Sequence, residues 1–557
     1  MKKKIISGIV LMLASLIMLT IINVPTFNEQ VIKFESTYKD KAVELEASYY
    51  ECDDAEYAVL ICPGYSCDRE KWLPMASLFR GNGLTVMTFD YSGQGNSDGT
   101  IGFDNAKNDC IPEEIDDALE KLHELSGIDY DHIILVGHSM GGRSILRLLA
   151  DYNREGMETN VSYKDIRNVI LLSPEVNYEY SAQASLFAGT SDESTEPWKS
   201  YSNSDIGNAN IYLFGSIHDD VVSGYDILAI YKHLGGNVEL ENKVYEDSTV
   251  VSNNKLTVKV SDLTLHSYMM YSGKYAGFVS EAIKDITGSI SYDSNLFYLI
   301  YPSWILALVG LALLLSGLNT KTEYASSSLT IIDEKKFLIH KLIAWLPGLL
   351  IAFLLCCICV IIPFGSPIMN IPYMLCIAGY GIIMFIYYRR GKFKGTSGKL
   401  ELPTLKCKVK DYKFILIFVG IVLYIWYILR MSMYRLLPLN SRLFWLVVAT
   451  ILMSIGYYIS NVENGMLKRI NASKKTIILY NIIQYFALFL FVLFYFIIKS
   501  YSGFIGQIQN MICMYIFVLP LGKYVGNKVN NQFIGAIVSA FLFQALMITS
   551  AAIIAMF

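Results

Sequence analysis

Residues 132–142 read HIILVGHSMGG, and this stretch decides how the first half of the chain folds. Four apolar residues, Ile133 to Val136, lead into a Gly-x-Ser-x-Gly pattern at 137–141, and a helical pattern over 143–152 follows it. A strand, a sharp turn and a helix in that order hold the serine of the turn at the top of a sheet, with its hydroxyl accessible. We therefore predict that Ser139 is a nucleophile rather than a serine that caps a helix.

Short apolar runs recur on both sides of this motif, separated by segments of helical length such as 72–81 and 112–126. Strands that alternate with helices predict a mostly parallel sheet with helices on both faces, and an active site at the carboxyl ends of the strands. Two alternating runs near the start predict an antiparallel hairpin. The hairpin runs are Val31–Tyr38 and Ala42–Tyr50, and the later strands are Tyr57–Ile61, Thr85–Phe89, His132–Val136, Asn168–Leu172, Asn210–Phe214 and Leu256–Val260.

Three motifs within residues 29–287 resemble those of an α/β-hydrolase, close to the branch of monoglyceride lipases, lysophospholipases and serine aminopeptidases. They are Cys62-Pro63-Gly64-Tyr65, Phe89-Asp90-Tyr91-Ser92-Gly93-Gln94-Gly95-Asn96-Ser97 and Gly137-His138-Ser139-Met140-Gly141-Gly142. The family usually has His-Gly where this chain has Pro63-Gly64. The amide of Met140, which follows the nucleophile, is one expected donor of the oxyanion hole. The resemblance implies that the amide of Tyr65 is the other, and that the loop 90–97 is structural.

The acid and the base of this fold follow the nucleophile in the order Ser, Asp or Glu, His. Asp219 and Asp220 come directly after a predicted strand, and the resemblance favours Asp219, with Asp220 as the alternative. His266 is the expected base because it follows one strand-like run and precedes a helical segment. His218 comes before the acid, and His233 lies in an amphipathic run that indicates a helix surface.

Two segments of the predicted α/β-hydrolase domain have no clear periodicity. Residues 174–208 are polar and aromatic, and we expect a small cap over the site there. Residues 239–254 lengthen the gap between acid and base, which indicates an insertion or an extra strand. The expected reaction is acyl transfer from an ester to water through an acyl-enzyme, and it needs no cofactor and no metal.

The chain as a whole is richer in apolar residues and poorer in charged residues than an average soluble domain. Apolar residues make up 53% of the 557 residues and charged residues only 17%. An apolar run over 5–24 behind three lysines predicts an uncleaved transmembrane anchor within 1–28. The α/β-hydrolase domain is then expected at 29–290 and a membrane domain of about eight helices at 291–557. The eight further apolar runs lie near 295–316, 342–363, 371–388, 413–430, 443–460, 476–498, 508–522 and 533–556.

Charge is divided unevenly between the two halves. Residues 25–294 carry 44 Asp and Glu against 20 Lys and Arg, whereas residues 295–557 carry 6 against 23. The loops near 317–341, 389–412, 461–475 and 523–532 contain 4, 8, 4 and 2 Lys and Arg. Because cationic loops stay in the cytoplasm, this pattern predicts a multi-pass protein of a bacterial plasma membrane with its hydrolase domain outside. The acidic domain argues against binding of nucleic acid.

The function expected from these features is a membrane-bound serine hydrolase that cleaves a small-molecule or lipid ester at the bilayer. A peptidase or an acyltransferase with the same triad is an alternative. A transporter or scaffold with an accessory hydrolase domain is another, although no Asp or Glu lies near the middle of a predicted crossing, as an ion-coupled transporter would require.

Overall fold

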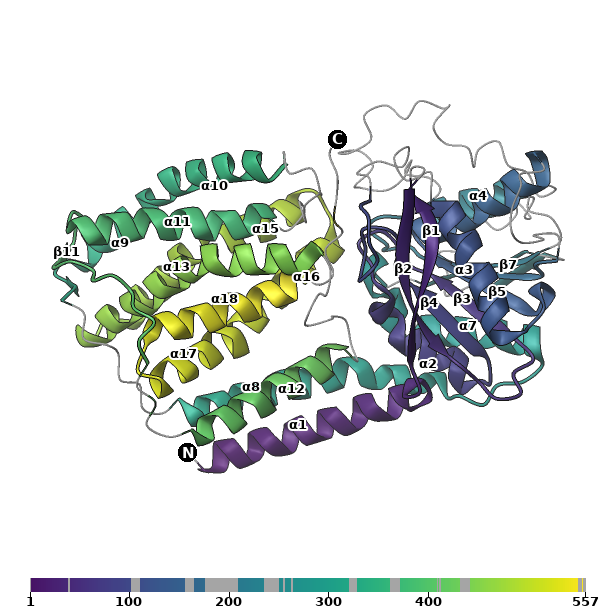
Figure 1. The fold of residues 1–557 in the computed structure, drawn as a ribbon, viewed down its shortest axis with the longest axis horizontal. Helices are drawn as coiled ribbons and strands as arrows, with labels where there is room; N and C mark the ends of the chain where they lie inside the picture. Colours follow the sequence, from purple (N-terminus) through teal and green to yellow (C-terminus); the bar gives the residue numbers. More distant parts are fainter. Residues whose placement is uncertain are drawn as a thin grey trace.

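The structure is a computed structural model that describes residues 2–38, 41–101, 111–155, 165–175, 209–234, 250–253, 256–261, 264–319, 328–360, 371–407, 409, 412–430, 441–548 and 553. Two parts lie side by side (Figure 1). One is a globular α/β domain. The other, called the helical region below, consists of the N-terminal helix α1 (Lys2–Asn23) together with residues 294–553.

A nine-stranded sheet forms the centre of the α/β domain, in the order β1-β2-β4-β3-β5-β6-β7-β9-β8. The strands from β4 through β9 in that order are parallel, whereas β1, β2 and β8 pair antiparallel with their neighbours. The predicted hairpin and all six predicted strands are present, and β8 is the extra strand expected near 239–254. The bounds are Gln30–Tyr38, Lys41–Tyr50, Ala58–Cys62, Thr85–Phe89, Ile133–His138, Asn168–Leu172, Asn210–Ser216, Val250–Asn253 and Leu256–Ser261 for β1 to β9.

Helices cover both faces of this sheet because successive side chains of a strand point to opposite faces. Leu60 and Leu135 belong to a core shared with α3 (Ile111–Ser126), α4 (Met140–Glu155) and α6 (Gly224–His233). Val59 and Val136 belong to the opposite core, with α2 (Leu73–Gly81) and α7 (Gly273–Thr287). This is the predicted α/β-hydrolase arrangement. The cap expected at 174–208 lies outside the described residues from 176 onward.

Each of the eight predicted apolar runs overlaps at least one helix of the helical region. By length and apolar composition, the described residues hold six candidate membrane spans, or seven if one bent pair counts as a span. The bent pair is α14 and α15, which meet at 67°. The helices are α8 (Ile300–Leu318), α9 (Glu334–Ile343), α10 (Trp345–Val360), α11 (Ile371–Arg390), α12 (Lys413–Arg430), α13 (Ser441–Arg469), α14 (Lys474–Gln484), α15 (Phe486–Ile497), α16 (Tyr501–Cys513), α17 (Leu519–Lys528) and α18 (Gln532–Ile548), with a π-helical turn, Met514–Val518, between α16 and α17.

One acidic residue lies where the sequence predicts a loop. Helix α13 continues to Arg469, so that Glu463 is helical and completely buried. Its carboxylate lies 2.5 Å from the ammonium of Lys341, which is also completely buried, and it accepts a hydrogen bond from Tyr388. The Lys341 ammonium also donates to Gln484. The helical region therefore contains a buried ion pair that the apolar pattern of the sequence does not indicate.

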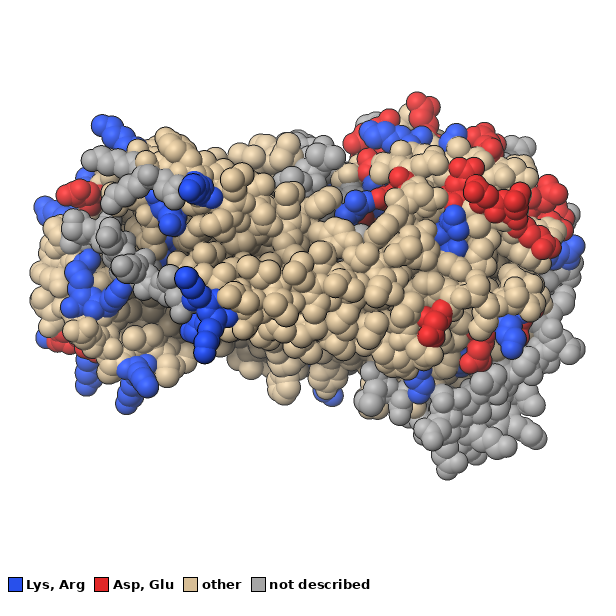
Figure 2. All heavy atoms as spheres, turned by 90° about the horizontal axis from the view of Figure 1, so that it is seen from below, with Lys and Arg blue, Asp and Glu red and all other residues tan. Residues whose placement is uncertain are grey.

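Charged side chains gather at the two ends of the molecule. Figure 2 shows Lys and Arg at the end of the helical region that lies farthest from the α/β domain, and most of the acidic residues on the α/β domain itself. The face between them has almost no charged atoms in this view. Most of the basic and most of the acidic side chains visible in this view thus lie at opposite ends of the molecule.

Candidate active site

Ser139 occupies the sharp turn between β5 and α4. Its backbone has a φ of 53°, in the left-handed region that residues other than glycine rarely adopt. The strained turn is held from both sides, because the Ser139 amide donates to the carbonyl of Leu172 at 3.1 Å and its carbonyl accepts from the Arg143 amide at 3.0 Å. A strained serine between a strand and a helix is the geometry that the nucleophile-elbow pattern predicts.

Two segments adjoin this serine: the first turn of α4, which begins at Met140, and the loop after β3 that leads to Tyr65. Met140 is the first residue of α4, and the first N–H groups of a helix have no acceptor within it. The loop after β3 approaches from the other side: a β-carbon on Gly64 would lie 3.0 Å from that of Ser139 and 2.8 Å from the ring of His138. Tyr65 follows directly in that loop. A glycine at position 64 thus allows the Tyr65 backbone to lie close to the serine.

Asp219 and His266 form a hydrogen bond at the same edge of the sheet. Asp219 follows β7, His266 follows β9, and 2.9 Å separates Asp219 Oδ2 from His266 Nδ1. The other carboxylate oxygen, Oδ1, accepts the amides of Val221 and Val222 at 2.8 Å each. Both side chains are buried. The carboxylate is therefore oriented by its own loop and holds the imidazole by Nδ1, which leaves Nε2 available.

The adjacent Asp220 points elsewhere. Its carboxylate accepts hydrogen bonds from the amide and the hydroxyl of Ser502, at 2.8 and 2.6 Å, and it makes none with His266. Among the described contacts Ser139 Oγ makes no hydrogen bond with His266, although such bonds often form only when substrate binds. The two predicted loops thus come together, and of the two candidate acids Asp219 is the one bonded to the histidine.

His138 is a residue of the site whose contacts the motif did not predict. Its Nε2 lies 3.2 Å from the backbone carbonyl of His266, and the two rings are 4.6 Å apart. Burial, together with the nearby His266, lowers the pKa of His138 well below its usual value. A neutral His138 therefore donates from Nε2 and links the serine turn to the backbone of the loop that carries His266. In the sequence, only the position of His138 next to Ser139 indicated that it belongs to the site.

Glu175 is a second residue that the sequence did not indicate. It follows β6, its amide donates to the carbonyl of Ser139 at 2.9 Å, and its carboxylate lies 3.6 Å from the guanidinium of Arg143. Burial raises the pKa of the Glu175 carboxyl, against the opposing effect of Arg143 and His266. Burial, with a contribution from Glu175, also raises the pKa of the Tyr65 hydroxyl. The site thus contains an additional carboxyl group close to the serine turn.

The pKa of His266 reflects the balance of these groups. Burial alone would lower it, but the charge and hydrogen bond of Asp219, followed by the charges of Asp220 and Glu175, raise it above its ordinary value. An imidazolium at this position is therefore favoured. Stabilising an imidazolium is what the acid of a Ser-His-Asp triad does when the histidine takes the proton of the nucleophile.

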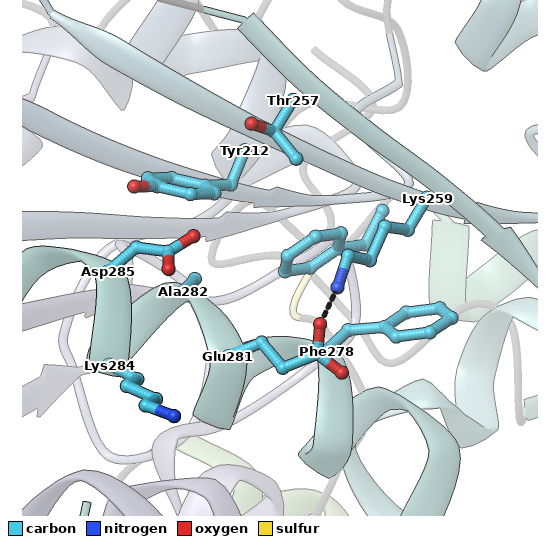
Figure 3. Close-up of a pocket in the computed structure, with 9 residues that line it drawn as sticks. Tyr212, Thr257, Lys259, Phe278, Glu281, Ala282, Lys284 and Asp285 are labelled. Atoms are coloured by element: carbon cyan, nitrogen blue, oxygen red, sulfur yellow. Dashed lines mark hydrogen bonds and ion pairs between the residues drawn. The ribbon is translucent and has the colours of Figure 1, made fainter. Parts of the chain in front are cut away.

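A separate pocket lies against α7, away from these residues. Figure 3 shows it between α7 and the strands β7 and β9, where the Lys259 ammonium is paired with Glu281. Its volume is about 300 Å³. None of the predicted site residues lines it; the lining residues are Tyr212, Phe214, Thr257, Lys259, Phe278, Glu281, Ala282, Lys284 and Asp285. This pocket is therefore distinct from the arrangement around Ser139.

Comparisons with known proteins bear on the α/β domain. Residues 57–201 match a family model described as the alpha/beta hydrolase fold. No curated protein matches the chain significantly. Similar solved structures include an esterase of Pyrococcus furiosus, at 16% identity over 46% of this chain and 90% of that one, with a TM-score of 0.33. A carboxyl esterase of Bacillus coagulans, at 13% identity over 48% of this chain and all of that one, has a TM-score of 0.33.

The family match extends from β3 through the serine turn to β6 and beyond, and thus includes the strand and helix on either side of Ser139. The sheet order and the helices on both faces agree with it. Residues outside the match, including Asp219 and His266, are placed by the structure alone. The chain therefore contains a domain of the α/β-hydrolase fold, joined to a helical region with several long apolar helices.

Proposed function

We propose that this protein is a membrane-bound serine hydrolase that cleaves a carboxylic ester. The observation that carries the proposal is the arrangement at one sheet edge of a serine in a strained strand-to-helix turn and a buried Asp219–His266 pair. Serine, histidine and aspartate in this spatial arrangement perform acyl transfer on several unrelated folds, whatever their order along the chain. A serine at the turn also disfavours the chemistries of this fold that use an aspartate nucleophile.

Each residue has a defined task in the proposed reaction. Ser139 Oγ attacks the ester carbonyl while His266 Nε2 takes its proton, and the resulting oxyanion accepts the amides of Met140 and Tyr65. His266 then gives the proton to the departing alcohol, which leaves the acyl group on Ser139. Water, deprotonated by His266, releases the acid and restores the serine.

Two features support a site at the outer surface of a plasma membrane. The basic end of the helical region lies opposite the α/β domain (Figure 2), as expected when Lys and Arg stay on the cytoplasmic side. The carboxyl ends of β4, β7 and β9, where active sites of such sheets lie, are followed by loops that contact the helical region. An ester held in the bilayer, such as an acyl lipid, would then reach the site without leaving the membrane, and a lipid ester is the substrate we propose.

Labelling with a fluorophosphonate that cannot cross membranes tests the reaction and the topology together. We expect intact cells to label the wild-type protein, Ser139→Ala to abolish labelling, and Ser144→Ala, a buried serine on α4, to retain it. Labelling only after lysis would preserve the enzyme and reverse the topology. Absence of labelling in both conditions would contradict the proposed chemistry.

A further inference from the structure

The loops that follow three strands of the sheet are bound by the helical region. After β4, the carbonyls of Gly93 and Gly95 accept hydrogen bonds of 2.6 Å from the buried guanidinium of Arg442. The backbone of Ile553 also pairs with this loop, since its amide donates to Gly93 at 2.8 Å and its carbonyl accepts from Ile101 at 2.9 Å. The loops after β7 and β9 both contact α16. The edge that carries the predicted triad is thus the edge that docks onto the helical region.

A second buried contact joins Asp220 to the first turn of α16. One oxygen of its carboxylate accepts the Ser502 amide at 2.8 Å and lies 3.5 Å from the Ser500 hydroxyl, and the other accepts the Ser502 hydroxyl at 2.6 Å. Only 4% of Asp220 is exposed. A carboxylate at a helix N-terminus is favoured by the partial positive charge of that end and by its N–H groups. In the described structure, every hydrogen bond of this carboxylate comes from the helical region.

The same helix contacts the loop that carries the base. The amide of Ser267, which follows His266 directly, points at the Ser502 hydroxyl at 3.4 Å. One residue later, the Tyr268 hydroxyl donates to Gln509 Oε1 at 3.1 Å. Helix α16 therefore contacts the neighbour of the proposed acid and the neighbour of the proposed base at the same time. Ser502 lies where these two loops meet.

We propose that α16 is a positioning element of the active site: by binding Asp220 and the residues after His266, it sets the Asp219–His266 pair in its catalytic arrangement, so that hydrolysis requires the helical region. This inference rests on the proposed function. It gives one helix of the helical region a role beyond anchoring. Ser502 and Gln509 touch neither the substrate carbonyl nor the proton, and act only through the two loops.

A contact that merely joined the two parts would behave differently. Arg430 of α12 forms an ion pair with Glu29, which precedes β1 at the far edge of the sheet, and this pair touches neither of the two loops. Its loss should weaken docking without changing the chemistry at Ser139. Loss of the Ser502 hydroxyl should instead slow the reaction of Ser139 in protein that is still folded. Arg430→Gln is therefore the matched control for Ser502→Ala.

The rate of fluorophosphonate labelling of the purified full chain in detergent directly measures the effect of α16 on the reactivity of Ser139. A hydrogen bond to a charged group is lost in Ser502→Ala, and we expect labelling to slow by about tenfold. Ser502→Thr, which keeps a hydroxyl, should restore the rate to within about twofold of wild type, and Arg430→Gln should stay within the same range. Should Ser502→Ala fail to fold, Gln509→Leu removes the acceptor of Tyr268 on the same helix and makes the same test.

The dependence of labelling on pH separates the charge effect of Asp220 from the positioning by Ser502. Four groups face His266: the carboxylates of Asp219, Asp220 and Glu175, and the neutral ring of His138. Asp220→Asn removes one of the three negative charges and retains an oxygen that can accept from Ser502. The acid limb of the labelling profile should therefore move to lower pH, because an imidazolium at 266 is less favoured. Ser502→Ala keeps all three charges, so it should slow labelling without moving the acid limb.

The outcomes of these experiments are distinct. If the wild-type chain is not labelled, the proposed function fails, and the role of α16 fails with it. If the wild-type chain is labelled but folded Ser502→Ala keeps its rate, the proposed function stands and the role of α16 is refuted. Slower labelling of Ser502→Ala with rescue by Ser502→Thr supports the inference.

Discussion

Three carboxylates surround the imidazole of His266, although the ring is buried. Asp219 is bonded to it, while Asp220 and Glu175 act through their charge alone. Burial of a histidine favours its neutral form, and nearby anions favour its charged form. Here the anions prevail, so that the pKa of His266 lies above its ordinary value.

The direction of this shift predicts the pH dependence of the wild-type protein. Only neutral His266 can accept the proton of Ser139, so labelling should fall as the pH drops through the pKa of the imidazole. Because that pKa is raised, we expect the fall to be centred above 6.5, the ordinary value. Fluorophosphonate labelling rates of the full chain at closely spaced pH values measure it. An acid limb centred below 6.5 would contradict the arrangement of charges around His266.

Asp219 and Asp220 show how far the sequence could define the site. The nucleophile followed from a local pattern, because a strand, a turn and a helix are contiguous. For the acid, the family resemblance favoured Asp219 but left Asp220 as an alternative. In the structure Asp219 bonds to His266, whereas Asp220 bonds to Ser502, which lies 282 residues further on. A sequence pattern contains no information on contacts of that kind. The Glu175 carboxyl was missed for the same reason.

At the scale of elements, the strands were the easiest to predict. Buried parallel strands appear as short, nearly continuous apolar runs, and each run expected in the α/β domain is a strand. The helical region was predicted less completely. The break of 67° between α14 and α15 falls within one apolar run, and α13 extends beyond its apolar stretch because Lys341 neutralises Glu463. Hydropathy alone indicates neither a bend nor a compensated charge.

Helices α1 and α8 pack through glycines that bring their backbones together. A β-carbon on Gly8 would lie 2.7 Å from the carbonyl oxygen of Gly310 and 2.8 Å from the amide nitrogen of Leu314. Small residues commonly permit such close approach of helices in membranes. The opposing atoms belong to the backbone and cannot rotate away, so that any side chain at position 8 must push the two helices apart.

We expect Gly8→Leu to destabilise the protein, because overpacking of a tight contact costs about 1–3 kcal/mol. Thermal unfolding of the full chain in detergent measures the change. Gly420→Leu on α12 is the matched control, since a β-carbon there meets no described atom within 4 Å, and it should unfold near the wild-type temperature. Equal unfolding temperatures for the two variants would show that α1 and α8 are not in close contact.

At the scale of the whole molecule, the two ends of the helical region carry different polar contacts. The end beside the α/β domain holds Ser502 and Arg442, which bind the loops of the sheet. The Lys341–Glu463 pair lies far from that domain, since α9 is at the opposite end in Figure 1. A buried pair of this kind contributes little when intact, but removal of one partner leaves an uncompensated charge.

Lys341→Met should therefore destabilise the protein by about 3–5 kcal/mol, whereas the double variant Lys341→Met with Glu463→Leu should recover most of the loss. Denaturant unfolding in mixed micelles measures both. The folded fraction of either variant should label with fluorophosphonate at the wild-type rate, because the pair does not touch the catalytic loops. A single variant as stable as wild type, or a slower rate of labelling, would contradict this separation of the two ends.

The bond between Asp220 and Ser502 has a consequence for biogenesis. Asp220 and Ser502 are 282 positions apart in the chain. At a synthesis rate of about 5–20 residues per second, Ser502 is made roughly 15–60 seconds after Asp220. During that interval the α/β domain has already emerged, while the helix that orders its acid and base loops has not yet been made. With the role proposed for α16, the nascent domain would be inactive, and hydrolysis would begin only after the later helices had assembled beside it.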